Sequence, residues 1–466
     1  MKKKTRNILF LILVAIFLIA VPFFIIYSQG YRIDFENRKL TQTGALFFKI
    51  EPGRSEVLIS KDKLKKTSFL FHSALIENLI PKKYKIEILK DGYYSWYKEL
   101  EVKAKTVTES KGIILIPKNP EITVASKNTQ QIWELPDNKN YILLETEKEN
   151  SWALKIYDIE KRLKTYLLQE KDFNSAEAQF LDLKVSSDGK RIILKMGIKE
   201  QIKYYLLEIN NPSKPVLLTY FNSDITKIAF DPSDNESIIY TKDRVLYKYN
   251  IKKQQYLPIL NKDDTFIPNI VSFETTNNDI YFLNSSGILT KTNSSFNNFE
   301  ELNKEPLIIK KETPYSIKTF NDFVFIIENK TIYLLNKENQ TFEFFFEGLV
   351  YLKPSPDYTK LLYGSDHEMW FMYLQEVYEG VKKNPKDKEF LIRTSKYIKE
   401  AVWLNSSYIA YNENENIKIT ETDTRDRLNI VDIAQIENPK LLWSGVKKEL
   451  LILSNLNLSL YSYSSF

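Results

Sequence analysis

The sequence predicts an all-β protein that is held at a membrane by one N-terminal helix. Three observations lead to this prediction: one uncharged apolar run near the N-terminus, an excess of aromatic and β-branched residues with only 12 glycines after it, and a segment pattern that repeats through most of the chain. Aromatic and β-branched side chains favour pleated strands over helices. In chain order we expect a transmembrane helix, a small β-sandwich and a β-propeller.

The apolar run covers residues 8–26 and follows directly on a basic cluster. About 20 apolar residues in a helix span the ~30 Å hydrocarbon core of a bilayer. We expect a cytoplasmic stub at residues 1–7, a signal anchor at residues 8–27 and the rest of the chain outside. The basic residues that set this orientation, because Lys and Arg favour the cytoplasmic side, are Lys2, Lys3, Lys4 and Arg6.

A cleaved signal peptide is the alternative. Its apolar region usually has about 7–15 residues and ends at a small-residue cleavage site. Here the run is longer and ends in large residues, with no A-x-A pattern near Tyr27. The sequence therefore favours an uncleaved, single-pass protein of the cell membrane, with its N-terminus in the cytoplasm and the bulk of the chain extracytoplasmic.

Composition excludes several classes of function. The chain has no cysteine, which excludes disulfides, zinc–thiolate sites and cysteine nucleophiles. Its 66 basic and 60 acidic residues are interleaved along the whole length. A nucleic-acid-binding protein usually gathers basic charge on one face, so we expect a solvated surface and no nucleic-acid partner.

Two short β-rich stretches follow the helix. Residues 28–42 alternate apolar and polar around Glu36 and predict a juxtamembrane β-hairpin. Residues 43–118 predict a compact β-domain, in which Gly53 and Gly92 mark turns because glycine is free to adopt positive φ.

The second of these stretches resembles the PEGA domain, a small surface-associated β-sandwich module. Glu51-Pro52-Gly53-Arg54 stands where that family has its name-giving tetrad, with Arg54 in place of Ala. Residues 85–93 match the family's Lys-x-Gly-Tyr half, whereas Lys83-Tyr84 stands where Gly-x-Tyr is usual. The resemblance covers about 75 residues and implies a non-catalytic interaction module at the cell surface.

The rest of the chain, residues 119–466, contains an internal repeat. Eight segments share a short apolar strand, a turn of Asp, Asn, Ser or Gly, and a strongly apolar strand, and they begin about 44 residues apart on average. Periods of about 40–45 residues with four strands each are typical of β-propellers. The segments start near Ile132, Leu183, Ile228, Ile270, Ile317, Leu352, Val402 and Leu442.

The repeat also predicts how the ring closes. The last segment is one strand short, and residues 121–126 precede the first segment and could supply that strand. We expect eight blades, with seven as the alternative because the repeats at Ile270 and Val402 are weak. Turns such as 187–190 resemble those of WD-like repeats in TolB-type propellers, although any type I turn favours these residues. Residues 377–388 predict a protruding loop.

No catalytic, cofactor-binding or metal-binding residue emerges from the sequence. The two histidines, His72 and His367, fall in different predicted domains, whereas a metal site or a serine triad needs clustered groups. No G-x-S-x-G or H-E-x-x-H motif occurs. The expectation is a protein without cofactors that is not an enzyme.

An aromatic strip is the candidate binding site of the β-domain. Aromatic faces stack on sugar rings and anchor protein partners. In a continuous strand Tyr94 and Trp96 would share one face, and Tyr93 and Tyr97 the other. One face must belong to the core, so a purely structural role stays open. The candidate residues are Tyr93, Tyr94, Trp96 and Tyr97.

Together these features predict a membrane-anchored, extracytoplasmic binding or scaffold protein of the cell envelope. The expected partners are the lipid bilayer and either cell-wall glycan or another surface protein. The alternative is a glycan hydrolase or lyase with its site in the propeller funnel. A convergent cluster of carboxylates there would favour that enzyme. A propeller subunit that helps envelope proteins insert or assemble is a third candidate.

Overall fold

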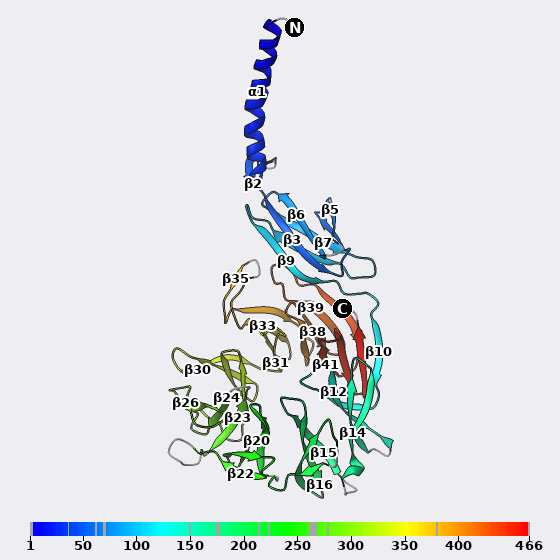
Figure 1. Cartoon of the computed structure of the whole chain (residues 1–466), viewed down its shortest axis with the longest axis vertical. Coiled ribbons are helices and arrows are strands. Elements are labelled where there is room, and N and C mark those ends of the chain that lie inside the picture. Colours follow the sequence, from blue (N-terminus) through cyan, green and yellow to red (C-terminus); the bar gives the residue numbers. More distant parts are fainter. Residues whose placement is uncertain are drawn as a thin grey trace.

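A computed structural model shows the helix, a small β-domain and a larger ring of sheets, one after another along the long axis of the molecule (Figure 1). Lys2, one of the four predicted topology residues, lies outside the described part of the chain. The structure describes residues 3–35, 37–60, 63–68, 71–148, 151–173, 178–212, 215–221, 224–260, 267, 269–276, 279–378 and 381–464.

The N-terminal helix, α1 (Lys3–Ser28), contains the apolar run and extends into the predicted stub. Its apolar side chains are exposed, and by length and composition it is able to cross a membrane. Two residues after its end, Gly30 has a φ of +80°, the left-handed conformation that glycine favours after a helix. The amide of Gly30 donates to the Tyr27 carbonyl at 3.1 Å, which satisfies part of the helix end.

A two-stranded hairpin, β1 (Tyr31–Asp34) and β2 (Lys39–Gln42), connects α1 to the β-domain. The β-domain, called the module below, consists of two sheets with strand orders β6–β3–β9 and β5–β4–β7–β8. The strands of the module are β3 (Gly44–Glu51), β4 (Glu56–Ile59), β5 (Lys63–Lys66), β6 (Ser73–Leu79), β7 (Lys83–Leu89), β8 (Trp96–Glu101) and β9 (Val107–Ile114).

One apolar core lies between the two sheets of the module. Leu46 and Phe48 of β3 contribute from one sheet, and Val57 of β4 and Ile86 of β7 from the other. Each of these strands alternates buried and exposed residues, because successive side chains of a strand point to opposite faces. The module is therefore a two-layer β-structure.

The two predicted turn glycines differ in conformation. Gly92 has a φ of +81°, but Gly53 does not have a positive φ. A Cβ at position 53 would lie 2.5 Å from Cδ2 of His72, so a larger residue there would displace the His72 ring. Close packing of a ring, and not turn conformation, explains this glycine.

After the module, the described residues form eight four-stranded antiparallel sheets, numbered sheets 1 to 8 below. Sheets 1 to 4 consist of β11 (Thr129–Glu134), β12 (Asn140–Thr146), β13 (Trp152–Asp158) and β14 (Leu163–Gln169); β15 (Ala178–Val185), β16 (Arg191–Ile198), β17 (Gln201–Glu208) and β18 (Val216–Leu217); β19 (Ile225–Asp231), β20 (Asp234–Lys242), β21 (Val245–Asn250) and β22 (Gln255–Pro258); and β23 (Ile270–Thr275), β24 (Asp279–Asn284), β25 (Leu289–Asn293) and β26 (Phe299–Glu301).

Sheets 5 to 8 continue the pattern, with one insertion in sheet 6. They consist of β27 (Tyr315–Phe320), β28 (Phe323–Glu328), β29 (Thr331–Asn336) and β30 (Thr341–Glu347); β31 (Tyr351–Pro354), β32 (Lys360–Gly364), β33 (Glu368–Tyr373) and β36 (Lys388–Arg393); β37 (Ala401–Asn405), β38 (Tyr408–Glu413), β39 (Asn416–Glu421) and β40 (Ile430–Gln435); and β41 (Pro439–Ser444), β42 (Glu449–Ser454), β43 (Ser459–Ser464) and β10 (Glu121–Ser126).

The sheets form a closed ring, which makes this region a β-propeller. Eight apolar cores each join two consecutive sheets, and the last joins Leu451 of sheet 8 to Tyr141 of sheet 1. The first strands of neighbouring sheets contact one another, as β19 and β23 or β37 and β41 do, so these strands line the inside of the ring.

The predicted closure by residues 121–126 is confirmed, because β10 pairs with β43 as the outermost strand of sheet 8. A polar cluster fixes this strand to sheet 1. Ser126 Oγ donates to Glu145 Oε1 at 2.5 Å, and Lys164 Nζ lies 2.8 Å from the same oxygen. Burial works to raise the pKa of Glu145, but hydrogen bonds from Lys155, Lys164 and Ser126 outweigh it and hold that pKa below its ordinary value.

The predicted loop at residues 377–388 is instead partly ordered as strands. β34 (Val377–Tyr378) and β35 (Lys382–Lys383) pair in a small sheet, and Lys388 already begins β36. Figure 1 shows β35 on the side of the propeller that faces the module.

Candidate functional site

The structure divides the four residues of the aromatic strip between different environments. The predicted sharing of faces is wrong, because β8 begins only at Trp96 and residues 93–95 precede the strand. Trp96 is 3% exposed and belongs to the module core, and Tyr93 packs against that core. Tyr94 and Tyr97 are exposed.

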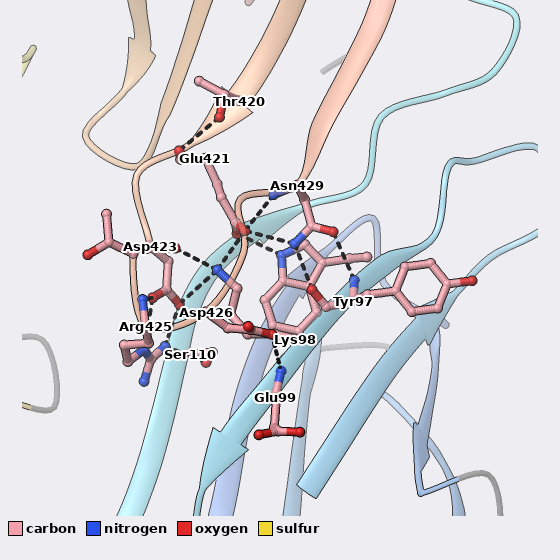
Figure 2. Close-up of polar contacts among 12 residues, drawn as sticks. Tyr97, Lys98, Glu99, Ser110, Thr420, Glu421, Asp423, Arg425, Asp426 and Asn429 are labelled. Carbon is pink, nitrogen blue, oxygen red and sulfur yellow. Dashed lines mark hydrogen bonds and ion pairs between the residues drawn. The ribbon is translucent and has the colours of Figure 1, made fainter. Parts of the chain in front are cut away.

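Trp96 is also part of the contact between the module and the propeller. Its Nε1 donates to Glu421 Oε2 at 2.7 Å. Glu421 ends β39 and opens residues 421–429, called the docking segment below, which run to the start of β40. Figure 2 shows this segment against β8 and β9 of the module.

A buried ion pair lies at the centre of this contact. Lys98 Nζ lies 2.7 Å from Glu421 Oε1, and the side chains are 0% and 4% exposed. The same carboxylate accepts hydrogen bonds from the backbone amide and the side-chain amide of Asn429, at 3.0 and 2.7 Å. Removing charges from water is costly unless hydrogen bonds replace the lost hydration, and here four donors surround one carboxylate.

The docking segment also satisfies the open edge of β8. The amide of Tyr97 donates to Asn429 Oδ1 at 3.0 Å, and Asn429 Nδ2 donates to the Tyr97 carbonyl at 2.9 Å. The amide of Glu99 donates to Asp426 Oδ2 at 2.8 Å. This hydrogen bond is the main reason that the pKa of Asp426 lies below its ordinary value. Unpaired strand edges invite aggregation, and here side chains of the propeller occupy that edge.

Arg425 extends the contact to β9, in the other sheet of the module. It donates to the Glu109 carbonyl at 2.8 Å and to Ser110 Oγ at 2.7 Å, and it pairs with Asp423 at 2.6 Å. Burial works to raise the pKa of Asp423, but Arg425 and the charge of Lys98 outweigh it and lower that pKa. The docking segment therefore joins both sheets of the module to sheet 7.

A large cavity, called the junction cavity below, lies between the module and one end of the propeller. Its volume is about 1370 Å³. The module contributes the β3–β4 turn, His72, Tyr93 and the end of β9, and the propeller contributes the turns that follow the first strands of sheets 1, 6, 7 and 8. Its aromatic and apolar lining includes Trp403, Trp443, Tyr358, Leu442, Val446 and Ile114.

Few charged side chains line the junction cavity, and some of them already form hydrogen bonds within the protein. Burial raises the pKa of Glu134, and the charge of Asp137 raises it further. Asp357 is held in a turn by Ser355 and Thr359. Burial works to raise the pKa of Asp357, but these hydrogen bonds hold it below its ordinary value. Among the described residues that line the cavity there is no arginine.

The inner wall of the ring carries several lysines. Glu274 Oε2 lies 3.1 Å from Lys227 Nζ, and Glu274 Oε1 lies 2.7 Å from Lys318 Nζ. Lys353 Nζ lies 3.7 Å from Glu400. Burial is the main cause that lowers the pKa of both Lys227 and Lys353. These contacts pair lysines with carboxylates near the first strands of sheets 3 to 7.

The two histidines lie in different settings. His72 packs on Gly53 at the junction cavity, whereas His367, just before β33, lies beside Tyr397, which follows β36, with ring centroids 5.1 Å apart. In the part of the chain that the structure describes, no group of three or more His, Asp or Glu residues is placed to hold a metal ion.

Sequence reasoning missed Lys98 and its partners. A signal was present, because Lys98 alternates with Trp96 and Leu100 and so occupies a core-facing position of β8. A lysine is almost never fully buried without a partner. That partner lies 323 positions later in the chain, where no local pattern points to it.

Comparisons with known proteins give only distant likenesses. No protein-family model matches the sequence, and no curated protein matches it. The PEGA resemblance of residues 43–118 therefore stays a prediction.

Solved structures similar to this chain include propellers. The computationally designed Ika8 protein has 14% identity and a TM-score of 0.47, over 74% of this chain and 100% of that one. Dipeptidyl peptidase 4 of Porphyromonas gingivalis has 12% identity and a TM-score of 0.46, over 71% and 56%. The β-propeller domain of Cps50 (Swd1) from Myceliophteria thermophila has 9% identity and a TM-score of 0.43, over 74% and 100%.

Proposed function

We propose that this protein is a membrane-anchored scaffold of the cell envelope that binds a segment of another envelope protein in the junction cavity. In this proposal α1 is an uncleaved anchor, the module is a PEGA-like spacer, and the eight sheets are the blades of one propeller. The bulk of the chain lies outside the cytoplasm.

The junction cavity is the observation that carries the proposal. Small-molecule pockets usually have about 300–1,000 Å³, and this cavity has about 1370 Å³. Its lining is largely apolar and aromatic, with the backbone of several turns at its rim. Aromatic anchors in a desolvated groove supply most of the binding energy in protein interfaces. A polypeptide segment therefore fits the cavity better than a small molecule does.

The contacts of the docking segment also support this proposal. Because buried ion pairs and edge hydrogen bonds join the module to sheet 7, the two walls of the cavity are held at a fixed distance. A preformed groove avoids the entropic cost of ordering its walls when a ligand binds.

The test is crosslinking from inside the cavity. A photoreactive phenylalanine at Val446, which is 41% exposed in the cavity wall, should crosslink in cells to one defined envelope protein. Tyr358→Asp removes an aromatic ring that is 52% exposed at the same cavity and should reduce the crosslink at least tenfold. Tyr256→Asp is the control, because Tyr256 is 50% exposed on the outer strand β22.

Two results would contradict the proposal. One is an equal loss of the Val446 crosslink in Tyr358→Asp and in Tyr256→Asp, which would mean that contact with the neighbour does not depend on the cavity. The other is retention of the soluble residues 27–466 on isolated cell-wall glycan with no protein crosslink, which would favour glycan recognition. Trp96→Ala is unsuitable for this test, because Trp96 belongs to the core and to the contact with Glu421.

The alternative function is glycan cleavage, and one observation favours it. A glycosidase needs a carboxyl group that is protonated at neutral pH, and burial raises the pKa of Glu134 in the cavity wall. Release of soluble fragments from purified cell-wall glycan, lost in Glu134→Gln, would support the enzyme. If the unmodified protein releases no soluble fragments, glycan cleavage is excluded and the scaffold proposal stands.

A further inference from the structure

The β1–β2 hairpin presents an apolar face that no described part of the chain covers. Ile33 and Leu40 are cross-strand partners and are 53% and 52% exposed. Paired residues of an antiparallel hairpin project to the same face. Phe35 follows Ile33 by two positions and is 83% exposed. Ile33 and Leu40 thus share an exposed apolar face, and Phe35 is exposed in the turn that follows β1.

Contacts with α1 fix this hairpin at the end of the helix. The Arg32 guanidinium lies 3.5 Å from the centroid of the Tyr27 ring, and Arg32 Nη1 donates to the Tyr27 carbonyl at 3.0 Å. The amide of Thr43 donates to the Gly30 carbonyl at 2.9 Å. Figure 1 shows β2 directly at the module end of α1.

The opposite side of the hairpin is polar and turned toward the protein. Asp34 is buried and accepts hydrogen bonds from the backbone and side-chain amides of Asn37 at 3.0 and 2.8 Å. Arg32 Nη2 donates to Asn78 Oδ1 of β6 at 2.7 Å. The hydrogen bond between Arg32 and Asn78 joins this side to the module, and Ile33 and Leu40 lie on the other side of the two strands.

We infer that Ile33, Phe35 and Leu40 insert into the lipid surface that surrounds the outer end of α1. Ile33 comes five residues after Ser28, a chain length of at most about 18 Å, and the headgroup layer on each side of the hydrocarbon core is about 5–8 Å thick. An apolar face next to a spanning helix is favourably buried by about 5–10 Å in that layer. This inference rests on the proposed role of α1 as an anchor.

A basic residue next to this face matches the same partner. Arg38 is exposed in the turn just before β2. A long basic side chain reaches phosphate groups while its stem stays in apolar surroundings, and anionic lipids attract it. With α1 and the hairpin both in the membrane, the molecule has two contacts that fix the orientation of the module and the propeller.

The test uses spin labels on the full chain in vesicles of phosphatidylcholine with phosphatidylglycerol. Because the chain has no cysteine, Phe35→Cys and Leu40→Cys each give one labelled site. Both labels should be reached more readily by oxygen, which enters lipid, than by a water-soluble nickel chelate. Phe344→Cys is the control, because Phe344 is 64% exposed on β30 of the propeller, and its label should show the opposite preference.

Two further labels separate the possible failures. Ile16→Cys, in the middle of α1, reports whether the helix spans the membrane. Lys39→Cys lies on the other face of β2 from Leu40, and its label should be more open to the nickel chelate. If the label at Ile16 is more accessible to oxygen but the labels at Phe35 and Leu40 are more accessible to the nickel chelate, the hairpin inference is wrong and the anchor role of α1 still stands. If the label at Ile16 is itself more accessible to the chelate, both the anchor role and the hairpin inference are wrong.

Discussion

At the scale of single residues, the contact between Lys98 and Glu421 has the largest consequence. Neither side chain is exposed to water, and each is the other's counter-ion across two domains. Trp96 and Asn429 complete the shell of donors around the carboxylate. Breaking a buried pair by removing one partner costs about 3–5 kcal/mol, because the remaining charge stays buried.

Lys98→Met should therefore destabilise β8 and the docking segment by about 3–5 kcal/mol. Hydrogen exchange of the β8 amides measures this as a loss of protection, since it reports the opening of one region. Lys85→Met is the matched control, because Lys85 is exposed on the neighbouring strand β7. Equal protection in the two variants would show that the ion pair does not hold the junction.

Acid should weaken the same contact. The folded-state pKa of Asp423 lies below its ordinary value of 3.8, so this group stabilises the fold above about pH 4 and the effect is lost as the pH falls through the lowered value. Unfolding temperatures between neutral pH and strong acid should fall more steeply for the native chain than for Asp423→Asn. Parallel curves would contradict the prediction.

At the scale of the elements, closure of the ring by β10 is the decisive feature. It places the chain segment before the first repeat beside the last strand of the last repeat, and it buries an edge that would be open otherwise. The Ser126, Glu145 and Lys164 cluster then fixes β10 to sheet 1. The weak repeats at Ile270 and Val402 also form complete four-stranded sheets, because burial between neighbours compensates for weak local patterns.

A disulfide across this closure should stabilise the ring. Glu121 and Ser464 are register partners, and paired positions of antiparallel strands are close enough for a disulfide. Glu121→Cys with Ser464→Cys should crosslink on oxidation and stabilise the folded state by an amount typical of disulfides, about 2–4 kcal/mol, which is measured as a higher unfolding temperature. Each single variant is the control. Failure to crosslink in the folded protein would mean that β10 does not pair with β43.

At the scale of the whole molecule, the order of parts along the long axis matters most. α1, the module and the propeller follow one another (Figure 1), so the propeller is the part farthest from the apolar helix. The docking segment makes the module and the propeller one unit. In the proposed orientation, the junction cavity is then held at a fixed height above the membrane.

The orientation itself predicts a labelling pattern on intact cells. Leu456→Cys, 67% exposed on the propeller, should react with a maleimide that does not cross membranes. Arg6→Cys, in the first turns of α1, should react only after the cells are opened. The reverse pattern would place the propeller in the cytoplasm, and loss of the N-terminal residues from the purified protein would show that the helix is a cleaved signal peptide.

Features that depend on local periodicity could be read from the sequence. The apolar run from Ile8, the strand-rich composition and the spacing of the repeats predicted an apolar helix and a propeller, because burial imposes a period of two on strands and a long apolar stretch on a membrane span. The closing strand at Glu121 was also predictable, since the last repeat lacked its fourth strand.

The contacts between those elements became visible only in the folded molecule. Trp96 fitted an exposed binding strip in the sequence, yet it lies in a core and donates to Glu421 of the propeller. Lys98 and Glu421 are separated by most of the chain, and the junction cavity draws its walls from four sheets and the module. Periodicity records which face of a strand is buried. It does not record which distant segment buries it, because that choice depends on packing between elements that are remote in sequence.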